Sequence, residues 1–167
     1  MIDESQERQR SAVEANRTFL VVVDDSEEMQ VALHFASRRA MRTGGRVALL
    51  YVQQPAEFQH WMAVGDLMRE EAREEAEGLM QKLSAEVKEW SGNYPVVHMR
   101  EGDVGEELEK LLGEEESISV LVLAASTDTS GPGPLISYLV GKGSARLRVP
   151  VTIVPGSLSD AEIIAIT

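Results

Sequence analysis

The chain has 167 residues, 43% hydrophobic and 26% charged, which is typical of a single globular domain with one core. Its 28 acidic and 16 basic residues give a net charge of -12, so sequence-independent binding to nucleic acid or to an anionic membrane is excluded. The lack of cysteine excludes disulfides and a cysteine nucleophile. No stretch resembles a membrane helix or a signal peptide, so we expect a cytoplasmic protein.

The N-terminal part changes character at Thr18. Residues 1–17 are polar and lack a sustained apolar face, which predicts a flexible arm. Residues 18–23, TFLVVV, form an apolar run typical of a strand buried on both faces. A helix is expected to follow, with Ser26 as its N-cap and the pair Gly44-Gly45 as its stop.

The strand-and-helix unit then repeats along the chain. Between the second strand and the longest helix lies a loop whose Phe58, Trp61 and Met62 either cover a ligand or pack under the loop. Asp103 and Ser159 are expected to cap later helical segments, each with a glutamate three residues on. The expected strands are 18–23, 46–52, 95–99, 118–125 and 151–154, and the expected helices are 27–43, 66–90, 104–112 and a turn within the tail.

Five β-rich runs separated by helical patterns predict an α/β fold, a doubly wound parallel sheet with helices on both faces. We expect this domain to cover residues 18–155, between the arm and a C-terminal tail over 156–167. In the strand order 3-2-1-4-5, ligands bind at the carboxyl ends of strands 1 and 4. Asp24-Asp25-Ser26 and the loop after Ala124 would therefore meet in one crevice.

The loop after the fourth strand is rich in glycine. Gly133 is followed after nine residues by Gly143 and Ser144, and Pro134 suits the first position of a short helix. Successive backbone N–H groups at such a turn bind phosphate, and the only side chains between residues 129 and 150 that are charged at neutral pH are cationic, namely Lys142, Arg146 and Arg148. On spacing alone, a stiff surface turn explains the glycines equally well.

Asp24 is the candidate partner of this loop, because a carboxylate at a strand end accepts hydrogen bonds from an adenine amine or a ribose hydroxyl. A response-regulator receiver site would also need an aspartate after the third strand and a lysine after the fifth, and neither is present. The histidines lack ligand-like spacing, so no metal site is predicted. No nucleophile elbow accompanies Ser126 or Ser144, which argues against a hydrolase triad.

These residues resemble the universal stress protein family over residues 18–155. The likeness rests on VVVDDS before the first helix, LLYV in the second strand, GDVGEEL after the third, and the spacing Gly133-x9-Gly143-Ser144 before PVTIVP. The resemblance implies an adenine-nucleotide alpha-hydrolase-like fold that binds ATP and dimerises through its last strand, Val151–Val154. An apolar edge strand at that place independently favours pairing with a second copy.

The resemblance also implies the binding residues. Asp24, Val52 and Ala124 would flank the adenine. The phosphates would be held by Gly133, Gly143, Ser144 and the backbone of Ala145. The family pattern has a further glycine three residues before Gly133, where this chain has Ser130, and residues 127–129 are additional. The loop is therefore either lengthened by an insertion or altered as a site.

The sequence thus favours a dimeric stress-response protein that binds ATP, with AMP as an alternative ligand and Mg²⁺ as a companion of ATP. No water-activating base is evident near the phosphates, so any hydrolysis is expected to be slow and no catalytic residue is assigned. Two other functions stay open. One is a dimeric interaction module of the same fold that binds no nucleotide, and the other is an enzyme that adenylates or hydrolyses a small substrate.

Overall fold

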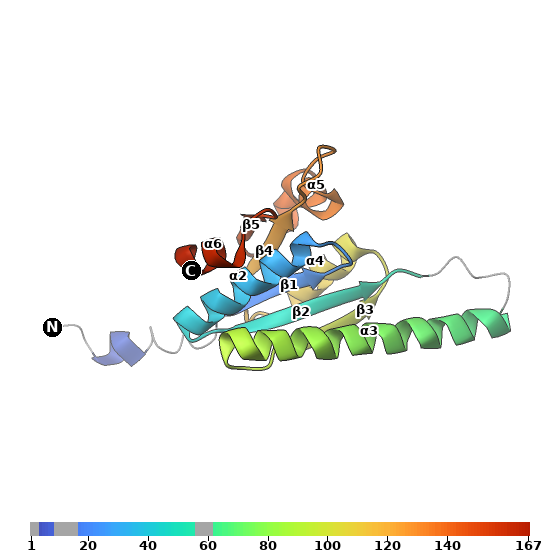
Figure 1. The fold of residues 1–167 in the computed structure, drawn as a ribbon, viewed down its shortest axis with the longest axis horizontal. Coiled ribbons are helices and arrows are strands. Elements are labelled where there is room, and N and C mark those ends of the chain that lie inside the picture. The colour runs from blue at the N-terminus through green and yellow to red at the C-terminus, as the bar shows by residue number, and fades with distance from the viewer. Residues whose placement is uncertain (1–3, 9–16, 56–61) are drawn as a thin grey trace.

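A computed structural model describes residues 4–8, 17–55 and 62–167 (Figure 1). Residues 4–8 form one exposed helical turn. The strands are β1 (Thr18–Val23), β2 (Arg46–Gln53), β3 (Val96–Glu101), β4 (Ile118–Ala125) and β5 (Val151–Pro155). The helices are α2 (Glu28–Thr43), α3 (Met62–Ser91), α4 (Val104–Glu114), α5 (Pro134–Val140), the 3-10 turn η1 (Ser144–Arg146) and α6 (Asp160–Ile166).

The five strands form one parallel sheet in the order β3-β2-β1-β4-β5. This confirms the predicted order and the predicted doubly wound fold. All six residues of β1 are buried, because it lies at the centre of the sheet with helices on both sides. The edge strand β3 is mostly exposed.

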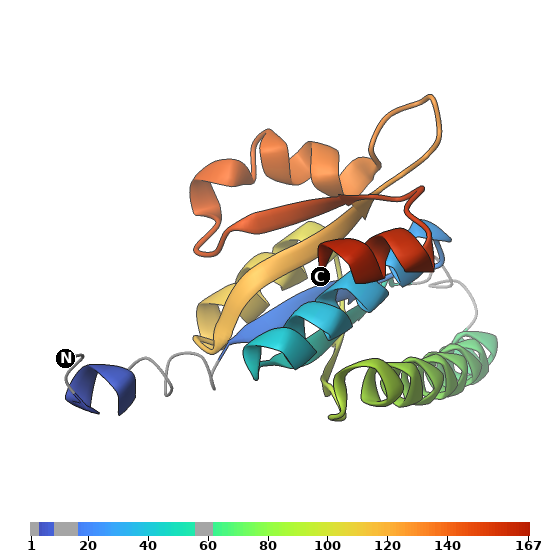
Figure 2. The ribbon, with the colours of Figure 1, turned by 60° about the vertical axis from the view of Figure 1, so that its left-hand side comes forward.

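Helices cover the sheet in two groups (Figure 2). On one face, α2 and α3 pack on a core that includes Leu33, Leu49 and Leu83. On the other face, α4 and α5 pack on a core that includes Leu50, Leu111 and Leu139. Helix α6 lies beside α2 on the first face. No helix in the described ranges combines the length and the apolar character needed to cross a membrane.

Most predicted element ends agree with the structure to within two residues. Gly44 ends α2 in the left-handed conformation, φ 68°, as its lack of Cβ allows. Asp103 caps α4 by accepting from the Glu106 N–H, and Ser159 forms a full capping box with Glu162. Pro134 occupies the first turn of α5, as predicted.

Two local predictions were wrong. Ser26 does not cap α2: the N-cap is Glu27, without a side-chain cap bond, and the Ser26 hydroxyl donates to Asp24 within the turn before the helix. Helix α3 begins at Met62, four residues before the expected start at Asp66. Its first turns extend past the carboxyl ends of the strands (Figure 1). Phe58 and Trp61, considered as a lid, lie outside the described residues.

Candidate functional site

Asp24 directly follows β1 and is exposed. Its Oδ1 accepts hydrogen bonds from the backbone N–H of Ser26, at 2.9 Å, and from the Ser26 hydroxyl. This is an Asx turn, which fixes the carboxylate at the end of the strand. Since only Oδ1 takes part, Oδ2 is left for an external donor. The neighbouring Asp25 is exposed as well.

The loop after β4 is closed across its base. The N–H of Ser126 donates to the carbonyl of Pro132 at 3.0 Å. Within the loop, Ser130 N donates to Asp128 Oδ1, and Gly131 N donates to the carbonyl of the same aspartate. Figures 1 and 2 show this loop standing out from the sheet next to α5. The additional residues therefore form a protrusion, and Gly133 lies next to the end of β4 despite the longer connection.

Gly133 has a backbone that other residues rarely adopt, with φ 108° and ψ 158°. A Cβ at this position would find no atom within 4 Å, so the space over its Cα is open. Register pairs Val21 of β1 with Val122 of β4. Continuing that register brings Asp24 opposite Ala125, the last residue of β4 and seven residues before the loop's closing carbonyl. Asp24 and Gly133 thus border the same edge of the sheet, between β1 and β4.

Gly143 and Ser144 lie beyond the opposite end of α5. That helix has seven residues, a length of about 10 Å. The N–H of Gly143 donates to the Tyr138 carbonyl at 3.0 Å, and that of Ser144 donates to the Gly141 carbonyl at 3.4 Å. The Ser144 hydroxyl donates to the Gly141 carbonyl too, at 2.9 Å. Both backbone donors therefore have partners inside the chain, and a phosphate would have to displace those partners.

Gly143 is also tied to the packing of Tyr138. A Cβ on Gly143 would lie 3.0 Å from Tyr138 Cε1, and a Cβ on Gly105 would lie 2.8 Å from the same atom. The Tyr138 hydroxyl donates to Glu109 Oε1 at 2.6 Å. This hydrogen bond to a carboxylate raises the pKa of Tyr138. The Tyr138 ring thus lies between Gly105, which belongs to α4, and Gly143, which follows α5.

Two of the three cations near the loop have partners in the structure. Arg146 contacts Glu109 Oε2 at 3.4 Å. Arg148 donates to three carbonyls, those of Leu112, Glu115 and Ile118, at 2.9 to 3.1 Å. It thereby supplies donors to the C-terminal end of α4, where helix carbonyls lack partners. Lys142 is exposed and has no recorded partner among the described residues.

The remaining predicted residues are spread over the sheet. Val52 is 9% exposed and belongs to the core under α4 and α5, whereas Ala124 packs against the core under α2 and α3. Ala145 lies in η1 and is exposed. The structure thus brings Asp24, Ala124 and Gly133 to one edge of the sheet, with Val52 one strand away. Gly143, Ser144 and Ala145 stand apart from them.

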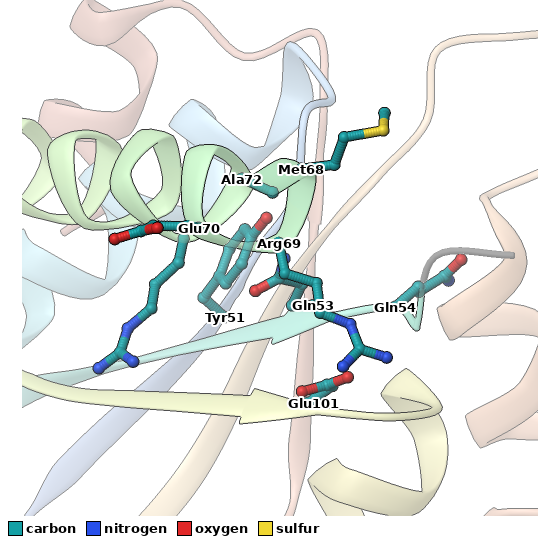
Figure 3. A pocket seen from close by; sticks show the side chains of 9 residues that line it. Tyr51, Gln53, Gln54, Met68, Arg69, Glu70, Ala72 and Glu101 are labelled. Atoms are coloured by element: carbon teal, nitrogen blue, oxygen red, sulfur yellow. The ribbon is translucent and has the colours of Figure 1, made fainter. Parts of the chain in front are cut away.

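A hollow of about 650 Å³ lies at the same carboxyl edge, under the projecting start of α3 (Figure 3). Tyr51 and Gln53 line it from β2, Glu101 lines it from β3, and Arg69 extends from α3 toward Glu101. Tyr51 pairs in register with Val23, the residue before Asp24. None of the seven predicted binding residues lines this hollow. Its polar side chains at strand ends were the signal in the sequence that could have indicated it.

The fold and the family model agree. The sequence model described as the Universal stress protein family matches residues 15–155. Universal stress protein UspA from Lactobacillus plantarum superposes with a TM-score of 0.69 at 21% identity, covering 83% of this chain and 97% of that one. A universal stress protein family member from Burkholderia pseudomallei gives 0.60 at 23% identity, covering 84% and 97%.

A third solved structure is described as a universal stress protein in complex with cAMP. Its TM-score is 0.59 at 16% identity, with coverage of 84% of this chain and 98% of that one. At these identities the structural likeness concerns the fold. Comparison with curated protein sequences returned no significant match. The family assignment therefore rests on the sequence model, which covers most of the chain, and the chain belongs to the universal stress protein family.

Proposed function

We propose that this chain binds an adenine nucleotide, ATP in the first place, at the carboxyl edge of the sheet between β1 and β4. The observation that carries the proposal is the bond from Ser126 N to the Pro132 carbonyl. It keeps Gly133, with open space over its Cα, beside the edge that also holds Asp24. Ligands of doubly wound sheets bind at this switch point.

A nucleotide at this edge would find distinct groups for each of its parts. The free Oδ2 of Asp24 would accept from the adenine amine or a ribose hydroxyl, with Val52 and Ala124 beside the ring. The backbone around Gly133 would approach the phosphates closely, because no side chain intervenes. The neighbour solved with cAMP supports the adenine nucleotide class. Mg²⁺ would accompany ATP as its counterion.

In the same proposal, Gly143, Ser144 and Ala145 contribute to phosphate binding. For this, the backbone N–H groups of Gly143 and Ser144 would have to give up their hydrogen bonds to carbonyls of the chain and donate to phosphate oxygens instead. The side chain of Ser144 is exposed, so its hydroxyl is accessible. The part played by this segment can be tested separately from that of Asp24, because substitutions at Asp24 and at Ser144 change different sides of the proposed site.

A second function is favoured by a specific observation. The Gly143 and Ser144 donors and the Arg146 and Arg148 guanidinium groups all have partners within the chain. Internal partners for all of these donors are what we would expect in a chain whose phosphate-binding groups no longer bind a nucleotide. The alternative is therefore a dimeric interaction module of the universal stress protein fold that works without nucleotide.

The first experiment separates these two functions. Freshly purified protein is analysed by native mass spectrometry for bound nucleotide, and is then titrated calorimetrically with ATP, AMP and cAMP. We expect a saturable binding heat with ATP at one site per chain. No co-purified nucleotide and no heat at millimolar concentrations of all three ligands would leave the interaction module as the function.

Two matched substitutions test the site itself. Asp24→Ala is expected to weaken ATP binding about tenfold or more, because a hydrogen bond to a charged group is lost. Asp25→Ala removes the same charge from the adjacent exposed residue and is expected to change the affinity less than about twofold. Ser144→Ala tests the distal segment: an affinity equal to that of the unchanged chain would remove Gly143, Ser144 and Ala145 from the site.

We further propose that the protein acts in the cytoplasm as a homodimeric regulator of a stress response. The dimer would form through β5, whose outer side has no neighbouring strand in the described part of the chain. Turnover of ATP is not required for this role, since a regulator can respond to occupancy alone.

A further inference from the structure

A second hollow, again of about 650 Å³, lies at the amino ends of β1, β4 and β5, which form the amino edge of the sheet, opposite the carboxyl ends of the strands. Arg17 precedes β1, Thr152 belongs to β5, and Arg39 belongs to the last turns of α2. Ile166, at the end of α6, completes the rim. Figure 2 shows α6 alongside α2, running back from the carboxyl edge of the sheet toward the amino edge.

The walls of this amino-edge hollow combine apolar side chains with two cations. Phe19 is 4% exposed and forms part of the core floor, and Phe35 and Ile166 add aromatic and aliphatic surface. The charged residues that line the hollow are Arg17 and Arg39, and no acidic side chain is among the described lining residues. In a chain with a net charge of -12, this is a local reversal of sign.

Neither guanidinium has a partner in the described part of the chain. Both arginines are half-buried, yet no ion pair or side-chain hydrogen bond joins either of them to a described residue. The nearby Arg38, in contrast, donates to the Thr167 hydroxyl at 2.9 Å. An anion in the hollow would therefore find two guanidinium groups whose hydrogen-bond donors are not used within the described part of the chain.

We propose that the amino-edge hollow binds a small carboxylic acid with an apolar body, such as a medium-chain aliphatic acid. The carboxylate would pair with Arg17 and Arg39, since guanidinium groups bind carboxylates with directed hydrogen bonds. The apolar body would lie against Phe35 and Ile166. The Thr152 hydroxyl, which has no recorded partner among the described residues, is available to a carboxylate oxygen.

This site is separate from the proposed nucleotide site. The two lie at opposite ends of the same strands, and the six residues of β1 span about 20 Å. The proposal does not depend on ATP binding, so either of the two can fail without the other.

The test is a calorimetric titration of the full chain with decanoate, kept below its micelle concentration, and with decanol as the neutral analogue. We expect saturable binding of one decanoate per chain and at least about tenfold weaker binding of decanol, because the charge-assisted hydrogen bonds are absent. Equal affinity for acid and alcohol would overturn the role of the arginines, and no binding heat at millimolar decanoate would overturn the site.

Substitutions locate the binding. Arg17→Gln and Arg39→Gln are each expected to weaken decanoate binding about tenfold, with the fold checked by circular dichroism. Arg42→Gln is the matched control: it removes an exposed arginine of the same helix that does not line the hollow, and its affinity should stay within about twofold. Unchanged affinity in both Arg17→Gln and Arg39→Gln would show that decanoate binds elsewhere and would refute the proposal.

Discussion

At the scale of single residues, the structure separates the two glycines that the sequence joined in one motif. Gly143 has an ordinary helical backbone, φ -77°, but its missing Cβ makes room for Tyr138. Gly143→Ala should therefore lower the free energy of unfolding by about 1–3 kcal/mol through overpacking. Gly113→Ala is the control, because Gly113 is helical with open space around it and alanine there should stabilise by about 0.5–1 kcal/mol.

Urea unfolding of both variants measures this difference. In a Tyr138→Leu background the cost of Gly143→Ala should shrink, because the ring that the new methyl meets is gone. An equal cost in both backgrounds would contradict the role of the ring and would assign the cost to the backbone of Tyr138 and Leu139, which a Cβ on Gly143 would approach to 3.2 and 3.3 Å. The consequence for function is direct: a larger substitution at Gly143 would disturb α5 whether or not phosphate binds there, so loss of ATP binding in such a variant would not locate the phosphates.

His98 provides a residue-scale prediction about pH. Burial, helped by the nearby Arg100, lowers its pKa, although Glu115 and Glu114 act in the opposite direction. The folded state therefore favours neutral His98, and this contribution to stability is present above the ordinary pKa and lost as the pH falls through the lower folded value. His98→Gln should lose less stability than the unchanged chain between about pH 7 and pH 5, as measured by urea midpoints.

Protonation of Glu114 does not contribute to the difference in urea midpoints between His98→Gln and the unchanged chain. The hydrogen bond from Arg100 lowers the pKa of Glu114, so the Glu114 contribution is lost only below the ordinary glutamate range. It is also present in both proteins being compared. A parallel decline of the two midpoints over the interval would show that protonation of His98 does not drive the acid sensitivity there.

At the scale of elements, Arg148 links the segment before β5 to the end of α4. Its guanidinium donates to the carbonyls of Leu112, Glu115 and Ile118. Arg148→Met should lower the free energy of unfolding by about 1–2 kcal/mol, because those carbonyls lose a charged donor at a helix end. Lys142→Met removes the same charge from an exposed residue of the same segment and should stay within about 0.5 kcal/mol. Equal costs in chemical denaturation would exclude the capping role.

The elements also show what the sequence was able to predict. The strands, the helices and most caps were predictable because hydrophobic period and cap residues act locally, as at Gly44, Asp103 and Ser159. The strand order was predictable from the general rules of doubly wound sheets. The exceptions are non-local or competitive. Ser26 is a residue type that favours the N-cap position, but its hydroxyl donates a hydrogen bond to Asp24, two residues before it. No local pattern shows that Arg148 reaches the end of α4 or that Tyr138 lies against Gly143.

The candidate site was predictable to a smaller extent. Asp24 and Gly133 were placed by topology, since the carboxyl ends of β1 and β4 adjoin in this sheet order. The distal pair was placed by spacing alone, and spacing does not reveal that residues 134–140 fold into α5 between the two glycines. The closure of the loop by Ser126 and Pro132 also depends on the three-dimensional path of the additional residues.

At the scale of the whole molecule, the sheet has two edges that differ in what they offer a second copy. On β5, Ile153 is 43% exposed, and on β3, Val97 is 39% exposed. In the described part of the chain neither strand has an outer neighbour, so each is open to pairing. Exposed apolar side chains occur near both edges: Val140, Ile164 and Ile166 lie on the helices before and after β5, and Tyr94, Val96 and Met99 lie at or next to β3. We expect β5 to be the dimer edge, as the resemblance to universal stress proteins implies, with an isologous antiparallel pairing.

Paired substitutions at the two edges decide between them. Ile153→Glu should convert the dimer to monomer, because two carboxylates would meet across the dyad of a pairing between two acidic chains. Val97→Glu makes a chemically similar change on the other edge strand and should leave the dimer intact. Light scattering coupled to size-exclusion chromatography measures the molar mass of each variant at tens of micromolar protein. Monomer formation by Val97→Glu alone would move the interface to β3, and a monomeric unchanged chain would refute the proposed dimer altogether.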